Sequence, residues 1–326
     1  MMKKRILSGM RPTGKLHLGH YTGALENWVK MQDEYENFHL VADYHVLTTK
    51  LDTSDIYNDS IEMVIDWLAV GLDPKKVKIF RQSQIKEHTE LFLILAMLIT
   101  TSRLERNPSL KEQVRDLNIQ HVVYGHLGYP VLQAADILIY KGELVPVGED
   151  QVPHVEITRE IARKFNSHFG DVFPEPEPLL TVFARLAGLD GKAKMSKSLG
   201  NAILLSDEPE IVKQKMRKAV TDPLKIHKND PGRPEVCVVY SYHQKFNTEE
   251  SDQIAADCRS GKLGCVECKL RASAKISAFL EPIIEKRKKY EADISLVLDV
   301  IDKGERAARK VAVETMTEVR TNMKIG

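Results

Sequence analysis

Short apolar runs alternate with longer amphipathic segments through the first 200 residues of the chain. The short runs have the length of buried strands, and they occupy residues 5–8, 39–42, 78–80 and 145–147. The longer segments place apolar residues three or four positions apart, as one face of a helix does, and they cover residues 18–35, 54–71, 89–101 and 152–169. This alternation predicts an α/β fold in which crossover helices join the strands of a parallel sheet.

The pattern changes near residue 200. Residues 170–195 are rich in proline and glycine, which predicts loops that close the first domain. Beyond residue 201 only helical periodicity remains, and it is clearest over residues 270–290 and 304–323. We therefore expect a Rossmann-like parallel-sheet domain over residues 1–200 and an α-helical domain over residues 201–326.

Composition excludes several classes of protein. Hydrophobic residues make up 43% of the chain, charged residues make up 29%, and the formal charge is +1, which is typical of a globular domain. Any polyanionic partner must therefore meet a local basic surface. The longest apolar run, residues 91–99, is about half the length of a bilayer-spanning helix. The basic N-terminus lacks the apolar stretch of a signal peptide, so we expect a cytoplasmic protein without a membrane partner.

The segment after the first predicted strand nearly matches a phosphate-binding P-loop. A P-loop needs a hydroxyl after its lysine to hold Mg²⁺ and a mobile backbone to surround the phosphates, whereas this chain has Leu16 after Lys15 and a rigid Pro12. Asp43, which follows the second predicted strand, would suit the acidic metal partner of such a site. A P-loop NTPase therefore remains an alternative.

Two histidines stand where the first predicted helix begins. His17 and His20 are three residues apart, so they share one helical face. Imidazoles there can donate hydrogen bonds to phosphate oxygens, beside the backbone N–H groups of a helix N-terminus. Gly19 between them leaves room for a nucleotide to approach the backbone. Taken alone, the pair is equally well explained by surface histidines or by half of a metal site.

A second motif is the basic loop Lys194-Met195-Ser196-Lys197-Ser198, which lies among glycines 188, 191 and 200. Two lysines on a flexible loop suit the neutralisation of charge on a departing pyrophosphate. Alone, this motif is also compatible with a solvated basic loop. Together and in this order, the two motifs resemble the HIGH and KMSKS signatures of class I aminoacyl-tRNA synthetases.

Longer blocks make the chain similar to the bacterial tryptophanyl-tRNA synthetases over nearly its whole length. The family opening Ser-Gly-x-x-Pro-Ser/Thr-Gly appears at residues 8–14, and more specific blocks occupy residues 129–138, 145–151 and 154–159. The resemblance implies an enzyme that activates L-tryptophan with ATP and Mg²⁺ and transfers it to tRNA(Trp). It also implies a homodimer.

The resemblance implies that adenylation proceeds without a protein nucleophile, because the substrate carboxylate itself attacks the α-phosphorus. Catalysis then depends on positioning and on charge stabilisation. At the triphosphate these roles would belong to His17, His20, Lys194 and Lys197. Positions that match the family's ATP contacts are Arg11, Pro12, Thr13, Gly19, His20, Gly148, Glu149, Asp150, Leu186, Lys194, Met195, Ser196, Lys197 and Ser198.

By the same resemblance Asp136 would accept the indole N–H, which suits a carboxylate because the indole nitrogen is a donor only. The rest of the tryptophan pocket would be formed by Leu7, His45, Tyr129, Gln133, Val145, Val147 and Gln151. For the apolar members a plain core role explains the sequence equally well.

Two positions depart from the family pattern. Many bacterial members have methionine in place of Gln133, and a glutamine three residues before Asp136 is what tyrosine-specific relatives use. A tyrosyl-tRNA synthetase is therefore the closest alternative. Leu7 replaces a common phenylalanine and alters the shape of the pocket. An inactive RNA-binding paralogue is the alternative that is not an enzyme.

All four cysteines fall within a short stretch of the C-terminal region, at Cys237, Cys258, Cys265 and Cys268. Their clustering and the closing Cys-x-x-Cys favour a four-thiolate metal site over scattered buried thiols, and thiolates bind both zinc and iron. A subset of bacterial tryptophanyl enzymes carries a 4Fe–4S cluster here with similar spacing. The resemblance therefore implies this cluster, with zinc as the alternative, in the module that meets the tRNA anticodon.

Overall fold

The computed structural model describes residues 3–116, 118–180, 186–191 and 194–325. Within these ranges, five parallel strands form one sheet in the order β3-β2-β1-β4-β5. The strands are β1 (Arg5–Met10), β2 (Glu36–Val41), β3 (Val77–Arg81), β4 (Leu144–Val147) and β5 (Glu177–Leu180). The predicted Rossmann-like sheet is confirmed, and the first four strands contain the four apolar runs of the sequence or most of each.

The fifth strand is a correction to the prediction of loops over residues 170–195. β5 pairs with β4 at the edge of the sheet, where Val145 lies opposite Pro178. A proline cannot donate a ladder hydrogen bond, but an edge strand tolerates it because one side of the strand has no partner. Residues 181–185 and 192–193 of the predicted loop region lie outside the described residues.

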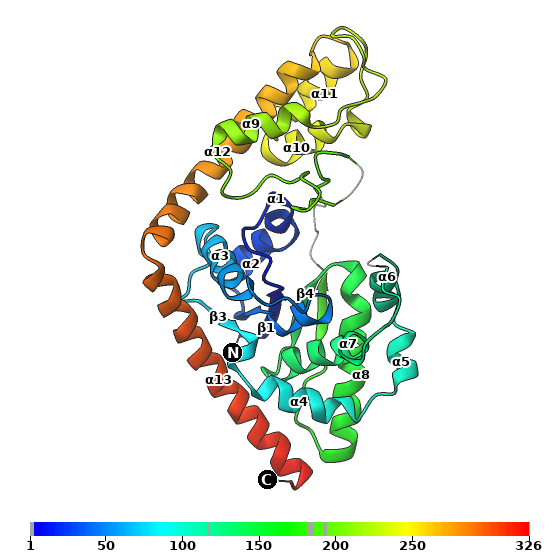
Figure 1. Ribbon diagram of the computed structural model, residues 1–326, viewed down its shortest axis with the longest axis vertical. Helices are drawn as coiled ribbons and strands as arrows, with labels where there is room; N and C mark the ends of the chain where they lie inside the picture. The colour runs from blue at the N-terminus through cyan, green and yellow to red at the C-terminus, as the bar shows by residue number, and fades with distance from the viewer. Residues whose placement is uncertain (1–2, 117, 181–185, 192–193, 326) are drawn as a thin grey trace.

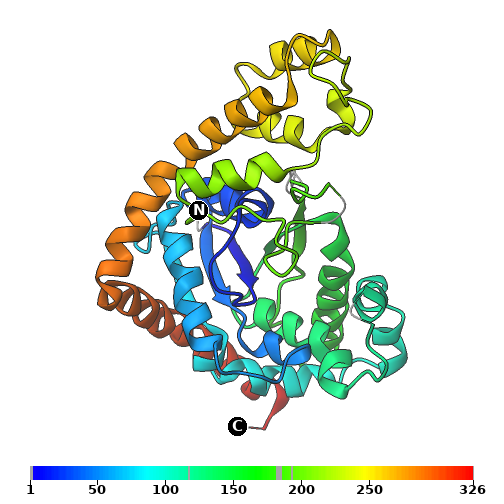
Figure 2. The same ribbon diagram turned by 45° about the horizontal axis from the view of Figure 1, so that its top comes forward.

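Helices cover both faces of the sheet, and Figure 2 shows the sheet between α3 on one side and α8 on the other. Alternate residues of β1 point to opposite faces: Ile6 packs in one apolar cluster with Trp28 and Trp67, and Leu7 packs in another with Phe165 of α8. The helices of this part are α1 (Leu18–His20), α2 (Glu26–Met31), α3 (Ile56–Ala69), α4 (Glu87–Ala96), α5 (Thr101–Glu105), α6 (Pro108–Asp116), α7 (Tyr124–Leu138) and α8 (Val152–Phe169).

The helix predicted over residues 18–35 is interrupted. A π-helical turn, Tyr21–Leu25, separates α1 from α2, and the helix ends at Met31. Turns of this kind are frequent at functional sites because they redirect side chains. Helix α7 was not predicted: it includes the block at residues 129–138, which the sequence had identified only as a motif, and it contains Pro130.

The C-terminal region is helical, as predicted. Its helices are α9 (Pro209–Lys218), α10 (Val238–Phe246), α11 (Ser251–Arg259), α12 (Cys265–Ala292) and α13 (Ile294–Met323). Figure 1 shows α9 to α11 at one end of the molecule, from which α12 and α13 run down along the sheet domain. None of the described helices is both long and apolar enough to cross a membrane.

Helix α13 packs against the edge strand β3. A side chain at Gly304 would overlap the backbone carbonyl of Ile79, so only glycine permits this close approach. The end of the chain thereby covers a strand edge of the first 200 residues. The division into domains at residue 200 remains a prediction.

Candidate active site

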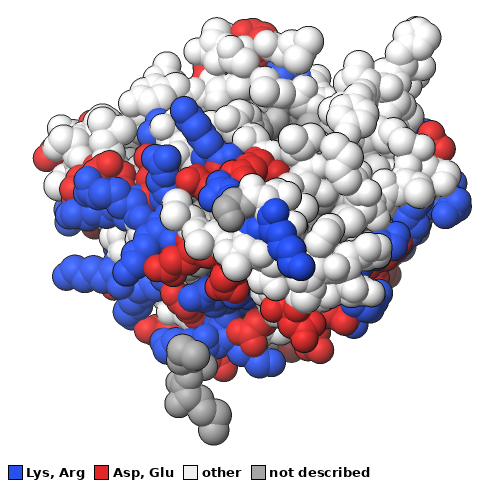
Figure 3. Space-filling view, turned by 90° about the horizontal axis from the view of Figure 1, so that it is seen from below, with Lys and Arg blue, Asp and Glu red and all other residues white. Residues whose placement is uncertain are grey.

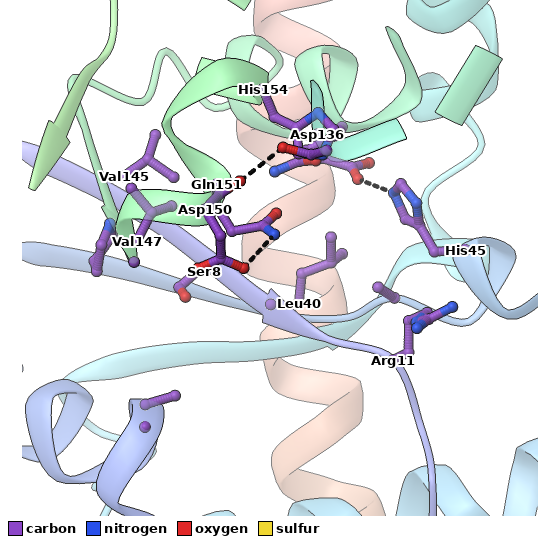
Figure 4. A pocket seen from close by; sticks show the side chains of 18 of the residues that line it. Ser8, Arg11, Leu40, His45, Asp136, Val145, Val147, Asp150, Gln151 and His154 are labelled. Atoms are coloured by element: carbon purple, nitrogen blue, oxygen red, sulfur yellow. Dashed lines mark hydrogen bonds and ion pairs between the residues drawn. The ribbon is translucent and has the colours of Figure 1, made fainter. Parts of the chain in front are cut away.

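A cavity of about 950 Å³ opens at the carboxyl ends of β1 and β4. In the strand order β3-β2-β1-β4-β5 the chain proceeds outward in opposite directions from these two strands. Parallel sheets bind ligands at such a switch point, because loops diverge there and leave a crevice. Figure 4 shows side chains from β1, β4, α7 and α8 around this cavity.

The cavity contains every residue that the sequence assigned to the tryptophan pocket. These residues are Leu7, His45, Tyr129, Gln133, Asp136, Val145, Val147 and Gln151. Five of the predicted ATP contacts also line it, namely Arg11, Gly148, Asp150, Lys194 and Ser196. The other residues predicted for ATP binding or catalysis do not line the cavity, namely Pro12, Thr13, His17, Gly19, His20, Glu149, Leu186, Met195, Lys197 and Ser198. The role of each residue remains a prediction.

Asp136 lies at the centre of a buried polar network. Its Oδ2 is 2.8 Å from Nε2 of His45, and its Oδ1 is 2.6 Å from Nδ1 of His88 and accepts from the Gln82 amide at 2.7 Å. Burial raises the pKa of Asp136. The hydrogen bonds and charges of His45 and His88 lower the pKa by a larger amount, so the net shift is downward. Asp136 is therefore held as an anion in an apolar setting.

Sequence reasoning missed Gln82 and His88, which come from a short 3₁₀ turn (Gln82–Gln84) and from α4. They stand about fifty residues before Asp136 in the chain. The only signal in the sequence was the presence of polar residues next to the apolar run of β3.

Tyr129 is fixed by a second buried chain of hydrogen bonds. Its hydroxyl is 3.0 Å from Nε2 of His154, whose Nδ1 is 2.9 Å from the side-chain amide nitrogen of Asn107. The Ser109 backbone N–H donates to the oxygen of that amide. This donor fixes the orientation of Asn107, so His154 accepts at Nδ1 and carries its proton at Nε2. Burial lowers the pKa of His154 to about 4, so the imidazole is neutral.

His17 and His20 stack on each other, with ring centroids 3.8 Å apart. Burial lowers the pKa of His17 to about 4 and that of His20 to about 3, and the charge of Lys197 lowers both further. The Nδ1 atom of His20 accepts from the His17 backbone N–H, so neutral His20 carries its proton on Nε2. A side chain at Gly19 would come within 3.0 Å of the His17 ring and 3.3 Å of Met195.

The lysine loop and the segment after it contact the chain around the start of α1. The Lys197 ammonium donates to the backbone carbonyl of Thr13. Residues 16–18 also pair with residues 203–205, through backbone bonds of 2.9 Å from Leu18 to Ile203 and from Leu205 to Leu16. The lysine-containing loop is thus joined to the start of α1.

Asn201 is a further residue that the sequence did not reveal. Its side-chain oxygen accepts the Ser196 backbone N–H at 2.7 Å, and its amide donates to the Lys194 carbonyl at 3.3 Å. Asn201 is buried. It therefore holds the lysine loop from within, although in sequence it is only a polar residue after a glycine.

Asp43 does not serve the role that a P-loop would give it. Its carboxylate accepts the backbone N–H groups of Tyr44 and Ser83 and the hydroxyl of Ser83. It joins the turns that follow β2 and β3. This geometry contradicts the reading of Asp43 as an acidic metal partner.

The four cysteines come from three neighbouring elements. Cys237 precedes α10, Cys258 lies in α11, and Cys265 and Cys268 lie in the first turn of α12. Burial raises the pKa of Cys268 to about 12, and the other three thiols contribute to this shift. Among the described residues, however, no group of three or more metal-binding side chains is arranged to hold an ion.

The sheet, the cavity at its switch point, the paired histidines and the attached lysine loop define the catalytic domain of a class I aminoacyl-tRNA synthetase. Residues 2–281 match the family described as tRNA synthetases class I (W and Y). Within the class, this chain belongs to that family, which confirms the resemblance of its motifs.

Named relatives agree with this assignment. The chain is 50% identical to a tryptophan–tRNA ligase of Thermotoga maritima, over 98% of this chain and 99% of the relative. It is 45% identical to one of Aquifex aeolicus, over 98% of this chain and all of the relative. The tryptophanyl-tRNA synthetase of Campylobacter jejuni in complex with ADP and tryptophan superposes with a TM-score of 0.88 at 32% identity, over 98% of this chain and 99% of that chain.

Proposed function

We propose that this chain activates L-tryptophan with ATP to form tryptophanyl-adenylate and then transfers tryptophan to tRNA(Trp). The observation that carries the proposal is the cavity, because all eight residues assigned to a tryptophan pocket from the sequence line it. Asp136 supplies an anionic acceptor among the apolar walls Leu7, Val145 and Val147. This combination suits a large apolar ring that carries one hydrogen-bond donor.

The chemistry at the triphosphate requires positioned donors and cations. In the proposal, the carboxylate of tryptophan attacks the α-phosphorus of ATP, and pyrophosphate leaves with Mg²⁺. Neutral His20 donates through Nε2, and Lys194 and Lys197 stabilise the negative charge that develops on the leaving group. The contact between Lys197 and Thr13 supports this arrangement, because it brings the lysine loop to the segment that precedes His17.

The test of substrate identity is ATP–pyrophosphate exchange with each of the twenty amino acids. We expect exchange with tryptophan alone. Exchange with tyrosine instead would transfer the assignment to tyrosyl-tRNA synthetase and identify Gln133 as the deciding residue. No exchange with any amino acid would favour the inactive RNA-binding paralogue.

We further propose that Cys237, Cys258, Cys265 and Cys268 hold a 4Fe–4S cluster, with Zn²⁺ as the alternative. Support comes from their common region and from the chemistry of four thiols. Gly232 makes room for one of them, since a side chain there would lie 2.6 Å from Sγ of Cys258. When bound, the group would tie α10, α11 and α12 together.

Anaerobic purification followed by iron, sulfide and zinc analysis tests this proposal. About four iron and four sulfide per chain would support the cluster, and one zinc without iron would support the alternative. A Cys258→Ser variant should lose the metal, whereas the matched Ser260→Ala variant, at the residue that directly follows α11, should retain it. If the wild-type protein contained neither iron nor zinc, the proposal of a metal site at the four cysteines would be overturned.

The proposal includes a cytoplasmic homodimer that acts on tRNA. Light scattering should give twice the 37.0 kDa mass of one chain, and a monomeric mass would contradict the dimer. Figure 3 shows one face on which basic and acidic side chains intermix. This agrees with the formal charge of +1 and means that tRNA must be bound through local contacts.

A further inference from the structure

A chain of polar side chains lies behind the cavity wall at Asp136. The Tyr140 hydroxyl is 2.7 Å from Nε2 of His88, and Nδ1 of His88 is 2.6 Å from Oδ1 of Asp136. Tyr140 and His88 are completely buried, and neither lines the cavity. Any influence they have on a ligand must therefore pass through Asp136.

The direction of the hydrogen bonds in this chain follows from the proton on Tyr140. Burial, with the added charges of Asp136 and Glu87, raises the pKa of Tyr140 well above its ordinary value, so the phenol keeps its proton. That proton is donated to Nε2 of His88. A neutral His88 then carries its own proton on Nδ1 and donates it to Asp136.

The two oxygens of Asp136 consequently differ. Oδ1 receives two donors, His88 and the Gln82 amide, which fill its lone pairs. Oδ2 receives one donor, His45, and Figure 4 shows this bond beside the cavity. One lone pair of Oδ2 therefore remains for a ligand.

We propose that His88 and Tyr140 are positioning residues that determine specificity for a ring N–H in the amino-acid substrate. His88, held in place by Tyr140, donates to Oδ1 and fixes the carboxylate plane, so that Oδ2 of Asp136 presents its free lone pair to the cavity. This inference rests on the proposed tryptophan activity, because the indole ring supplies that N–H.

A packing role for Tyr140 must be separated from this polar role. Its ring stacks on Phe38 with centroids 4.7 Å apart and meets Phe80 edge-on at 5.2 Å. A loss of packing would impair every substrate to a similar extent. A loss of the polar chain would impair only a substrate that uses Oδ2.

The experiment compares tryptophan with 3-(benzothiophen-3-yl)alanine, in which sulfur replaces the ring N–H. The readout is the ratio of the two kcat/KM values in ATP–pyrophosphate exchange. For the wild type we expect tryptophan to be preferred on the order of 100-fold, since the analogue leaves a buried charge without its donor.

Four variants separate the roles. We expect His88→Leu to lower the ratio about tenfold and Tyr140→Phe to lower it about threefold, through the rate with tryptophan. His88→Asn, whose amide can replace the Nδ1 donor, should stay within about threefold of the wild-type ratio. Phe38→Leu is the packing control. It should reduce kcat/KM for both substrates to a similar extent and so leave their ratio unchanged.

The possible results distinguish the inference from the proposed function. A normal wild-type preference with an unchanged ratio in both His88→Leu and Tyr140→Phe would overturn the inference alone. Wild-type exchange with neither substrate would overturn the proposed function and the inference with it. A ratio that falls in His88→Leu and recovers in His88→Asn would establish His88 as a positioning residue.

Discussion

Arg287, near the end of α12, forms a buried ion pair with Asp66 of α3. The other oxygen of Asp66 accepts the backbone N–H of Leu16 at 2.6 Å, one residue before His17. Arg287 also pairs with Glu62 and Glu291, and it is almost completely buried. Arg287 therefore joins the C-terminal helices, through Asp66, to the segment just before α1.

Removal of Arg287 should destabilise the protein strongly. Arg287→Met would leave Asp66 buried without its cation, and breaking a buried pair from one side typically costs about 3–5 kcal/mol. The double variant Asp66→Asn/Arg287→Met should recover a large part of this loss, because no fully buried charge then remains unpaired; Glu62 and Glu291 are partly exposed to solvent. Urea unfolding of the four proteins of this cycle measures the effect, and simple addition of the two single losses would contradict it.

Loss of Asn201 should impair catalysis through the lysine loop. Asn201→Ala removes both side-chain bonds to Lys194 and Ser196. We expect the kcat of ATP–pyrophosphate exchange to fall about tenfold or more, because without these bonds the lysines of the loop are no longer held in position. A fall in thermal stability with normal kcat in the remaining folded protein would show that Asn201 serves only folding.

Substitutions of His20 and Lys197 should lower the rate more than they weaken ATP binding. Both groups would act most strongly on the charge of the departing pyrophosphate, so their loss raises the barrier without an equal effect on the ground state. For His20→Asn and Lys197→Ala we expect kcat to fall by about two orders of magnitude with a change in the KM for ATP of less than about fivefold. Steady-state exchange kinetics test this, and equal effects on kcat and KM would reject the assignment.

His39 should make the fold less stable in mild acid. Burial between Trp28 and Trp67 lowers its pKa to about 3, and neither ring nitrogen has a hydrogen-bond partner among the described residues. In the unfolded chain His39 binds a proton as the pH falls through about 6.5, whereas in the folded chain it stays neutral at that pH. Stability is therefore complete above that pH and is lost as the pH falls, by about 2 kcal/mol between pH 7 and pH 5.

Denaturant unfolding of the wild type and of His39→Phe at these two pH values measures this contribution. A constant packing cost cancels in the difference between the two pH values, so only the titration of His39 remains. The variant should lose about 2 kcal/mol less than the wild type between pH 7 and pH 5. Equal losses would show that His39 is protonated in the folded protein.

Periodicity was sufficient to predict the main elements of the sheet domain. The strands near Leu7, Leu40 and Ile79 are buried on both faces and so appear as continuous apolar runs. Helix α8 has the predicted bounds because its apolar stripe and Gly170 are local features. β5 was missed because its proline, Pro178, is acceptable only at an edge, and the edge is set by the order of the strands.

The candidate site was predictable only in part, for a similar reason. Residues such as Tyr129 and Asp136 stand in long blocks that resemble a family, so the sequence could reveal them. His88 and Asn201 act by touching residues that are distant or unremarkable in sequence. Their positions depend on the packing of α4 against α7 and on the loop after residue 194, which no local pattern encodes.

Aminoacylation of purified tRNA by the full chain tests the central claim most directly. The assay would offer tRNA(Trp) and tRNA(Tyr) transcripts, each with labelled tryptophan and with labelled tyrosine, in the presence of ATP and Mg²⁺. We predict that tryptophan is attached to tRNA(Trp) and that the other three combinations remain uncharged. Attachment of tyrosine to tRNA(Tyr), or no charging of tRNA(Trp), would contradict the account.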